Sequence, residues 1–168
     1  MSADRYLGWF HVEALGRHPI KSDILEIGLV ITDGTRELGS TACVIHCDQQ
    51  EELPHWIERR YKSNSNEYPV SLLEEAAASE TTLQQASEQL LDFIHGVCGT
   101  SDKRVLIPCG TNVAFQFIQR RFRNLSKCFL TFRMVDTDGL YQFVRTFFPT
   151  LQRQMPRRPR VDRALTNC

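Results

Sequence analysis

A nearly continuous apolar run constrains the fold of this chain more than any other feature of its sequence. Ile24 to Thr32 read ILEIGLVIT, a stretch of strand length in which Glu26 is the only charged residue. Strands covered on both faces show such runs, whereas a strand with one face in water alternates apolar and polar residues. The run therefore predicts a buried strand with other parts of the chain packed on both of its faces.

The segments on either side of this run predict an antiparallel meander. Arg5 to Val12 is a β-prone stretch, and Ser40 to His46 is a candidate third strand. Gly16 to Ser22 contains glycine and proline and is expected to be a loop. Asp33-Gly34 marks a tight turn. Short connections of this kind join consecutive strands as hairpins, so we expect three antiparallel neighbours.

The rest of the chain alternates helical and strand patterns. The predicted elements are a helix over Leu53–Tyr61, a helix behind a capping box of Thr81 and Gln84 with its end marked by Gly96 and Gly99, a strand over Val105–Cys109, a helix after Gly110-Thr111-Asn112, a strand over Phe132–Val135, and a helix capped by Thr137 or Asp138 and ended by Pro149. This order predicts an α/β fold with a mixed five-stranded sheet, in which an antiparallel three-stranded meander and parallel strands are flanked by helices. The chain is expected to form a single domain over 1–168, with 149–168 an irregular tail rich in Arg and Pro.

Charge is balanced over the whole chain but is distributed unevenly. Twenty basic and 20 acidic residues give a formal net charge of zero, which argues against a nucleic-acid binder driven by overall charge. Arg145 to Arg163 nevertheless holds six arginines and one acid, Asp162. Such a run is typical of contact with RNA or with an acidic partner, and equally of a solvated face that balances the acidic middle of the chain.

The six cysteines predict free thiols in a reducing, intracellular compartment. Neither a secretory signal nor a conventional mitochondrial presequence is visible. The sequence does not distinguish between the cytoplasm, the nucleus and the mitochondrial matrix. Cys43, His46 and Cys47 suggest zinc, but no second pair follows at a suitable spacing, so Cys43 is expected to be a buried strand thiol. No apolar stretch is long enough for a membrane span, and no membrane partner is expected.

Several blocks of the sequence resemble the oligoribonucleases, which are 3′–5′ exonucleases of the DEDD group in the ribonuclease-H-like superfamily. WFHVEALG, the loop RHPIKSD and ILEIGLVITDG match the opening W-x-D-x-E-x-T-G strand, loop and I-x-E-I-A-x-x-x-T-D strand of that family. The segment from Cys109 to Phe117 is similar to C-G-N-S-x-x-x-D, and Met134 to Leu140 to Y-L-D-x-S-x-L. Asp162 to Asn167 lies where the family has H-x-A-L-D-D. The resemblance implies a ribonuclease-H-like fold.

The same resemblance implies a two-metal exonuclease site, with four acids that bind Mg²⁺ or Mn²⁺ and a His that acts as general base. Here the four acid positions hold His11, Glu13, Gln116 and Asn167, and the general-base position holds Asp162. Glu13 is therefore the only metal-binding carboxylate retained. The departures predict a degenerate site, in which His11 forms an ion pair with either Asp162 or Glu13.

Three functions are consistent with these residues. The leading hypothesis is a pseudo-nuclease that needs no cofactor and acts as a binding or scaffolding subunit, in an RNA-containing assembly. The alternative is an active Mg²⁺- or Mn²⁺-dependent 3′–5′ exoribonuclease on short RNA, in which His11, Glu13 and Asp162 converge on one ion. The third is a purely structural subunit without nucleic-acid contact.

The expected partners are RNA, other protein subunits, or both, and the resemblance adds a possible homodimer. The absence of the family's final helix leaves an apolar surface that another element is expected to cover. The candidate RNA-binding residues are arginines in the loop after the first strand, in the second half of the chain and in the tail: Arg17, Arg120, Arg121, Arg153, Arg157, Arg158 and Arg160.

Overall fold

The computed structural model describes residues 6–48, 55–61, 71–99, 106–130, 133–154 and 164. The elements in chain order are β1 (Tyr6–Ala14), β2 (Ile24–Thr32), β3 (Glu37–Val44), α1 (His55–Tyr61), α2 (Leu72–Ala78), α3 (Leu83–Cys98), β4 (Leu106–Gly110), α4 (Asn112–Arg121), α5 (Arg123–Ser126), β5 (Val135–Asp136), α6 (Thr137–Phe147) and α7 (Pro149–Gln152).

The strands form one five-stranded sheet in the order β3-β2-β1-β4-β5. β1 pairs antiparallel with β2, and β2 antiparallel with β3, whereas β4 runs parallel to both β1 and β5. This is the mixed α/β sheet that the sequence predicts, and its meander is confirmed. The apolar run is β2, with the predicted bounds, and six of its nine residues are buried in succession before the pattern alternates.

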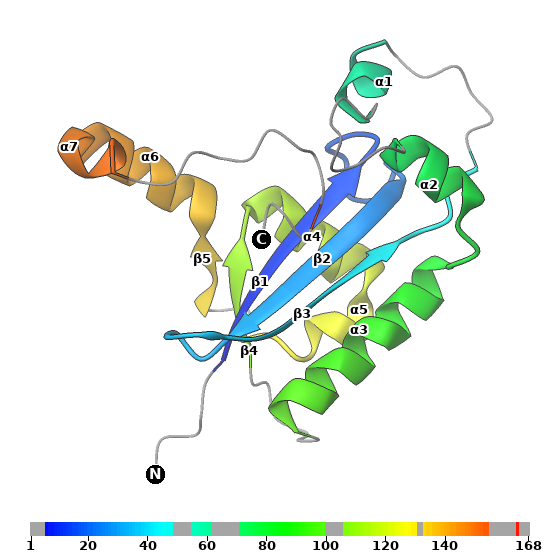
Figure 1. Ribbon diagram of the computed structural model, residues 1–168, viewed down its shortest axis with the longest axis horizontal. Coiled ribbons are helices and arrows are strands. Elements are labelled where there is room, and N and C mark those ends of the chain that lie inside the picture. The colour runs from blue at the N-terminus through cyan, green and yellow to red at the C-terminus, as the bar shows by residue number, and fades with distance from the viewer. Residues whose placement is uncertain are drawn as a thin grey trace.

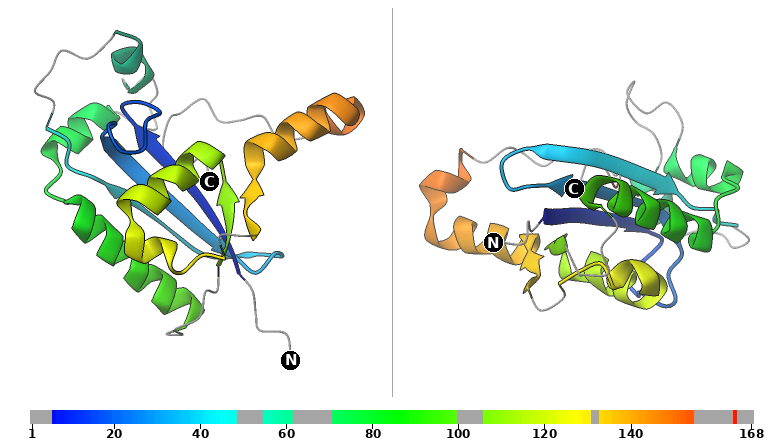
Figure 2. Two further views of the ribbon diagram at one scale, coloured as in Figure 1. Left: turned by 180° about the vertical axis from the view of Figure 1, so that it is seen from behind. Right: turned by 90° about the horizontal axis from the view of Figure 1, so that it is seen from below.

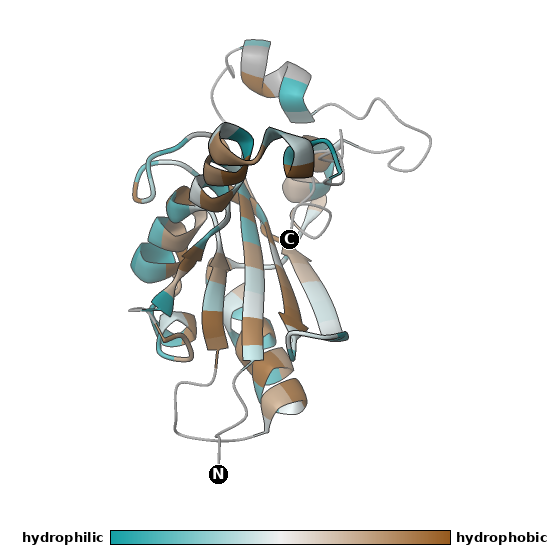
Figure 3. Cartoon of the chain, turned by 90° about the vertical axis from the view of Figure 1, so that its left-hand side faces the viewer, coloured by the Kyte–Doolittle hydropathy of each residue, from teal (hydrophilic) through white to brown (hydrophobic). Residues whose placement is uncertain are grey.

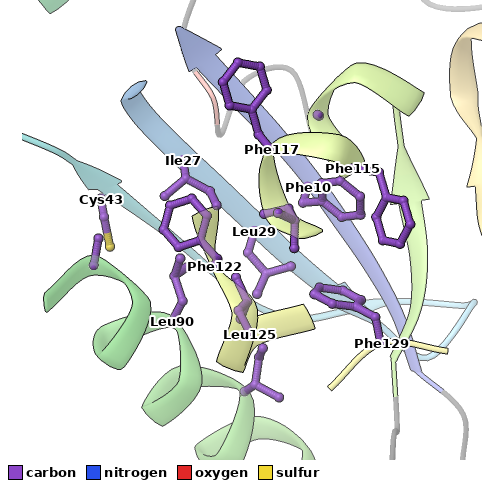
Figure 4. Close-up of a cluster of buried hydrophobic side chains, with 14 of the residues drawn as sticks. Phe10, Ile27, Leu29, Cys43, Leu90, Phe115, Phe117, Phe122, Leu125 and Phe129 are labelled. Atoms are coloured by element: carbon purple, nitrogen blue, oxygen red, sulfur yellow. The ribbon is translucent and has the colours of Figure 1, made fainter. Parts of the chain in front are cut away.

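One face of the sheet is covered by α3, α4 and α5, which lie together in Figures 1 and 2. The core between them and the sheet is built from aromatic and branched side chains. Figure 3 shows hydrophobic residues, in brown, along the strands and on the helices. Phe10 is central to this core, since its ring lies 5.9 Å from that of Phe115 and 5.6 Å from that of Phe129 (Figure 4). Phe117 and Phe122 are also buried. The two phenylalanines of α4, and Phe122 between α4 and α5, are therefore packing residues and are not available to stack on bases.

A second, smaller cluster lies where α1 and α2 approach the end of the meander. It contains Leu25 of β2, Ile57 and Tyr61 of α1, and Leu72 and Ala76 of α2. The helix α2 was not predicted. A capping box begins it, because the Ser71 side chain accepts from the Glu74 backbone N–H while Glu74 accepts from the Ser71 backbone N–H.

Several predicted boundaries of β1, β3 and α3 differ from those observed. β1 continues to Ala14, beyond the predicted end at Val12, and β3 begins at Glu37, before Ser40. The capping box of α3 lies one residue later than predicted, at Thr82 and Gln85, whose side chain reaches the Thr82 N–H. Gly96 lies inside α3, and Gly99 is the residue that caps its end.

The fifth strand, predicted over Phe132–Val135, is shorter and begins later than expected, and Phe132 lies outside the described residues. Phe129 forms an isolated parallel bridge with Leu106, and β5 itself contains only Val135 and Asp136. Asp136, rather than Thr137 or Asp138, caps α6, and its side chain accepts from the Asp138 backbone N–H. Pro149 begins the short helix α7, so the first part of the expected irregular tail is helical, and residues 155–163 and 165–168 lie outside the described part of the chain.

Candidate functional site around Glu13

His11 and Glu13 lie on the same face of β1, because side chains two positions apart in a strand point to the same side. The opposite face of this strand carries Phe10 and Val12, which pack in the core beneath the helices. Alternation along β1 thus separates packing residues from the two residues that the sequence places at the nuclease positions.

Glu13 is fully buried, and both of its carboxylate oxygens are occupied. His11 Nε2 lies 3.0 Å from Glu13 Oε1. Glu13 Oε2 accepts from Arg60 Nη2 at 3.1 Å and lies 3.1 Å from the Tyr61 hydroxyl, which is also 2.8 Å from the Ala14 carbonyl oxygen. The Arg60 guanidinium lies 5.2 Å from the centre of the Tyr61 ring. The end of α1 therefore closes over the carboxylate with one cation and one hydroxyl.

These contacts set the charge of the carboxylate. Burial alone would raise the pKa of Glu13, but the hydrogen bond and charge of His11, with Arg60 and Tyr61, outweigh it and hold that pKa below its ordinary value of 4.5. Glu13 is consequently an anion at neutral pH, and the positively charged Arg60 neutralises it. Of the two pairings predicted for His11, the pairing with Glu13 is observed.

A second buried carboxylate lies beside the first. Glu26 of β2 is the direct cross-strand partner of Glu13, and it is only 2% exposed. Glu26 Oε2 accepts from the Ala164 backbone N–H at 2.6 Å, and Ala164 is itself fully buried. Glu26 thus holds Ala164 against β2, beside the strand that carries Glu13.

The other predicted nuclease positions are not gathered here within the described residues. Gln116 is exposed on α4. Asp162 and Asn167 lie outside the described residues, although they flank Ala164 in the sequence by two and three positions. No group of three or more His, Cys, Asp or Glu side chains that could hold a metal ion occurs in the part of the chain that the structure describes.

The candidate RNA-binding arginines differ in their surroundings. Arg17, Arg120 and Arg153 are exposed. The Arg121 guanidinium donates to the Ile20 carbonyl at 3.0 Å and lies within 3.5 Å of the Ser22 carbonyl, so it holds the loop after β1 against α4. The remaining candidates, Arg157, Arg158 and Arg160, lie outside the described residues.

Sequence reasoning missed three residues of this site. Arg60 and Tyr61 end a helix that was predicted, but no local pattern indicates that this end lies over β1. Glu26 offered a signal, because it is the single charge in an otherwise apolar buried run, and a buried carboxylate requires partners.

The cysteines do not form a site in the described residues. Cys43 is the buried strand thiol that was predicted, and its Sγ lies 3.2 Å from Gln89 Oε1. Cys47 packs in the smaller cluster around α1 and α2. Burial raises the pKa of both thiols, which therefore remain protonated at neutral pH. No helix in the described ranges is long and apolar enough to cross a membrane.

The sheet order and the helices that flank the sheet give a mixed five-stranded α/β fold of the ribonuclease-H-like type. Among solved structures, the exonuclease I from Methylocaldum szegediense superposes with a TM-score of 0.58 over 86% of this chain, at 11% identity, and the match spans 30% of that protein. At this identity the match shows the fold alone. No family model matches the chain.

The sequence is similar to curated oligoribonucleases. It is 29% identical to the oligoribonuclease of Haemophilus influenzae (strain PittGG) over 71% of each chain. It is 27% identical to that of Corynebacterium diphtheriae over 96% of this chain and 75% of the relative. Identity to the mitochondrial oligoribonuclease of Saccharomyces cerevisiae is 27%, over 90% of this chain and 58% of the relative. The chain is therefore oligoribonuclease-like in sequence and has an exonuclease fold.

Proposed function

We propose that this chain is a catalytically degenerate oligoribonuclease-like protein that acts as a binding or scaffolding subunit in an RNA-containing assembly. The observation that supports the proposal best is the occupation of both Glu13 oxygens by His11, Arg60 and Tyr61. A carboxylate whose two oxygens already interact with these partners has few lone pairs left to bind a metal ion.

Charge gives the second argument. Two divalent cations a few ångströms apart need several carboxylate ligands, and the four family positions here supply one, Glu13. Arg60 adds a positive charge 3.1 Å from that carboxylate, where a metal ion would meet repulsion. His11 and Gln116 do not replace the missing anions, since imidazole is a poor Mg²⁺ ligand and an amide oxygen is neutral. This donor set does not fit a pair of Mg²⁺ or Mn²⁺ ions.

The binding role is supported by basic residues that the described fold leaves free to meet a partner. Arg17, Arg120 and Arg153 are exposed, and they are joined in the sequence by the arginines of the C-terminal tail. RNA is the partner we propose for them, because arginine pairs with phosphate in a bidentate manner and stacks on bases. We place this role in a reducing compartment, in keeping with the free thiols of the described residues.

The test compares metal binding and digestion in the native chain and in a reverted one. Calorimetry with Mn²⁺ and Mg²⁺, and 3′ digestion of a short RNA labelled at its 5′ end, are measured for both. The reverted chain combines His11→Asp, Gln116→Asp, Asp162→His and Asn167→Asp. We expect no metal binding and no digestion from the native chain, and metal binding from the reverted chain.

The matched control adds Glu13→Gln to each chain, which removes the retained carboxylate at constant shape. Digestion by the native chain that disappears in Glu13→Gln would contradict the proposal and establish an active exoribonuclease with an altered metal site. A reverted chain that binds no metal would show that these four substitutions are not what separates the chain from the active enzymes.

A further inference from the structure

The part of the chain that forms α4 and α5 carries positive charge that no nearby acid in the sequence balances. Between Asp102 and Asp136 the chain has no acidic residue, although its formal net charge is zero. The same stretch contains seven basic residues, which are Lys103, Arg104, Arg120, Arg121, Arg123, Lys127 and Arg133. Four of the seven lie in α4, in α5 or at the residue that ends α5.

The fold turns three of these cations toward solvent. Four residues of α4 and Leu125 of α5 are buried in the core, and Figure 2 shows the two helices as a layer over one face of the sheet. Arg120, Arg123 and Lys127 are exposed. Arg123 and Lys127 are four positions apart on one helical turn, which places their side chains next to each other.

The loop after β1 adds a fourth cation at the end of α4. Arg121 Nη1 lies 3.0 Å from the Ile20 carbonyl oxygen and 3.5 Å from that of Ser22. Lys21 lies between these two residues and is exposed, so Arg121 holds it beside the last turn of α4. The four exposed cations, Arg120, Arg123, Lys127 and Lys21, are named here the α4–α5 basic face.

None of these four side chains forms a salt bridge with an acid among the described residues. Lys127 Nζ donates to Asn124 Oδ1 at 3.0 Å instead. Asp23, the acid of the same loop, lies near Cys47, where burial first and the Asp23 charge second raise the pKa of the thiol. Cations without an internal counter-charge attract an external anion.

The side chains around these cations favour a phosphate backbone over a protein or a membrane. A protein interface has an apolar core, and a helix that binds a membrane surface inserts an apolar face. Here the exposed large hydrophobic residues are only Ile20 and, at the far end of α4, Val113. Three amides, Gln116, Gln119 and Asn124, are exposed instead. Amide side chains, like Arg and Lys, hydrogen-bond to phosphate and sugar oxygens.

The extent of the face favours a single strand. Arg120 and Lys127 are seven positions apart, about two helical turns, which is room for a few phosphates. Recognition of a duplex by its shape uses contacts spread over two successive grooves.

This face is separate from the site around Glu13. Phe10 and Val12 pack in the core with the buried residues of α4, whereas His11 and Glu13 point to the other side of the sheet. A strand bound on α4 and α5 therefore lies away from the buried carboxylate.

From these features we infer that the α4–α5 basic face binds the phosphate backbone of single-stranded RNA. The inference rests on the RNA-binding role proposed above, and it deepens that role by assigning it to a defined surface other than the C-terminal tail.

The test measures binding of the full chain to a labelled oligouridine of about 12 nucleotides, by fluorescence anisotropy at several salt concentrations. We expect the combined Arg120→Gln, Arg123→Gln and Lys127→Gln variant to bind at least about tenfold more weakly near physiological salt. Its slope of log affinity against log salt should fall by about 2, since each phosphate contact on a single strand contributes about 0.7.

Two controls separate loss of charge from loss of folding. Arg120→Lys combined with Arg123→Lys keeps both positive charges, and its salt slope is expected to equal that of the native chain. Arg36→Gln removes an exposed cation that pairs with Asp33 outside this face, and it is expected to bind as the native chain does. Circular dichroism of every variant verifies folding.

Three results would overturn the inference. A native salt slope in the triple variant would leave the RNA-binding role standing but assign it to another surface. No oligouridine binding by the native chain would contradict the RNA-binding role itself. A triple variant that keeps oligouridine binding but loses binding to polyglutamate or to phosphatidylserine vesicles would assign the face to an acidic protein or to a membrane. Metal binding and digestion enter none of these assays, so they are independent of the metal-site test.

Discussion

The buried carboxylate of Glu13 depends on partners from two parts of the chain. His11 comes from the same strand, whereas Arg60 and Tyr61 come from α1, nearly 50 positions later (|i−j| of 47 and 48). An anion removed from water is tolerated only where hydrogen bonds and opposite charge replace its hydration. The contacts of Arg60 and Tyr61 with Glu13 therefore help to hold α1 against β1, and they also shape the site.

Glu13→Gln tests that structural role. The amide keeps the shape of the side chain but loses the charge, so the partners His11 and Arg60 lose their anion. We expect the free energy of unfolding to fall by about 2 kcal/mol, measured by urea denaturation at neutral pH. Glu37→Gln, at an exposed position on β3, is the control and should change little. A more stable Glu13→Gln protein would instead indicate a strained site kept for metal binding.

The stabilisation by Glu13 is expected to depend on pH in a defined direction. The pKa of Glu13 is lowered in the folded protein from its ordinary value of 4.5. A group with a depressed pKa stabilises the fold fully above its unfolded pKa and loses that stabilisation as pH falls through the folded pKa. The difference in unfolding free energy between the native chain and Glu13→Gln should thus be constant down to about pH 5.5 and shrink below about pH 4.5. A difference that grows on acidification would contradict the assignment.

How far the site could be predicted depended on whether its contacts are local. The pairing of His11 with Glu13 was one of the two pairings that were anticipated from the sequence. The positions of Arg60 and Tyr61 over Glu13 depend on how the segment before α1 folds back, which no local pattern specifies. Sequence alone therefore indicated where the chain departs from the family's acids, but not the Arg60 cation that lies against Glu13.

At the scale of elements, errors were concentrated where a single side chain decides a boundary. α2 has only seven residues and was missed, although Ser71 and Glu74 form a capping box. The α3 box moved by one residue because Thr81 and Thr82 are adjacent and each has a glutamine three positions later. β5 has only two residues and begins three positions later than the predicted fifth strand. Long periodic segments such as β2 and α3 were predicted well, since many residues agree on one assignment.

Two glycines provide a matched pair for the contact between β1 and β4. A Cβ on Gly110 would lie 2.6 Å from the Phe10 carbonyl oxygen, whereas nothing lies within 4 Å of one on Gly96. We expect Gly110→Ala to destabilise the fold by about 2 kcal/mol or more, because the backbone must move to relieve the overlap. Gly96→Ala, inside α3, should stabilise it by about 0.5 to 1 kcal/mol. Thermal or urea unfolding of both variants tests the pair, and equal effects would contradict the close approach.

At the scale of the molecule, the fold class followed from element order, because three hairpin strands and later crossover helices permit few sheet arrangements. Net charge gave no comparable guidance. The acidic middle and the basic tail cancel in the sum, while a binding surface depends on where the charges lie.

The proposed RNA contact predicts a measurable salt dependence. If the tail arginines meet phosphates, the affinity for a single-stranded oligouridine should fall with salt. Changing Arg157, Arg158 and Arg160 to Gln should reduce the slope of log affinity against log salt by about 2, since each phosphate contact on a single strand contributes about 0.7. Arg36→Gln is the control, because Arg36 already lies 3.4 Å from Asp33. An unchanged slope in the triple variant would show that these tail arginines do not contact the RNA phosphates.

The central position of β1 also affects how the chain folds. The neighbouring hairpin strand β2 can pair early with one edge of β1. The other edge pairs with β4, in which Leu106, the partner of Tyr6, lies 100 positions later in the chain. Pairing over so long a loop costs chain entropy before the new contacts repay it, so the sheet should close slowly. During synthesis the meander can assemble well before β4 has been made. Throughout that interval one edge of β1 has unpaired backbone groups, open to strands of other chains.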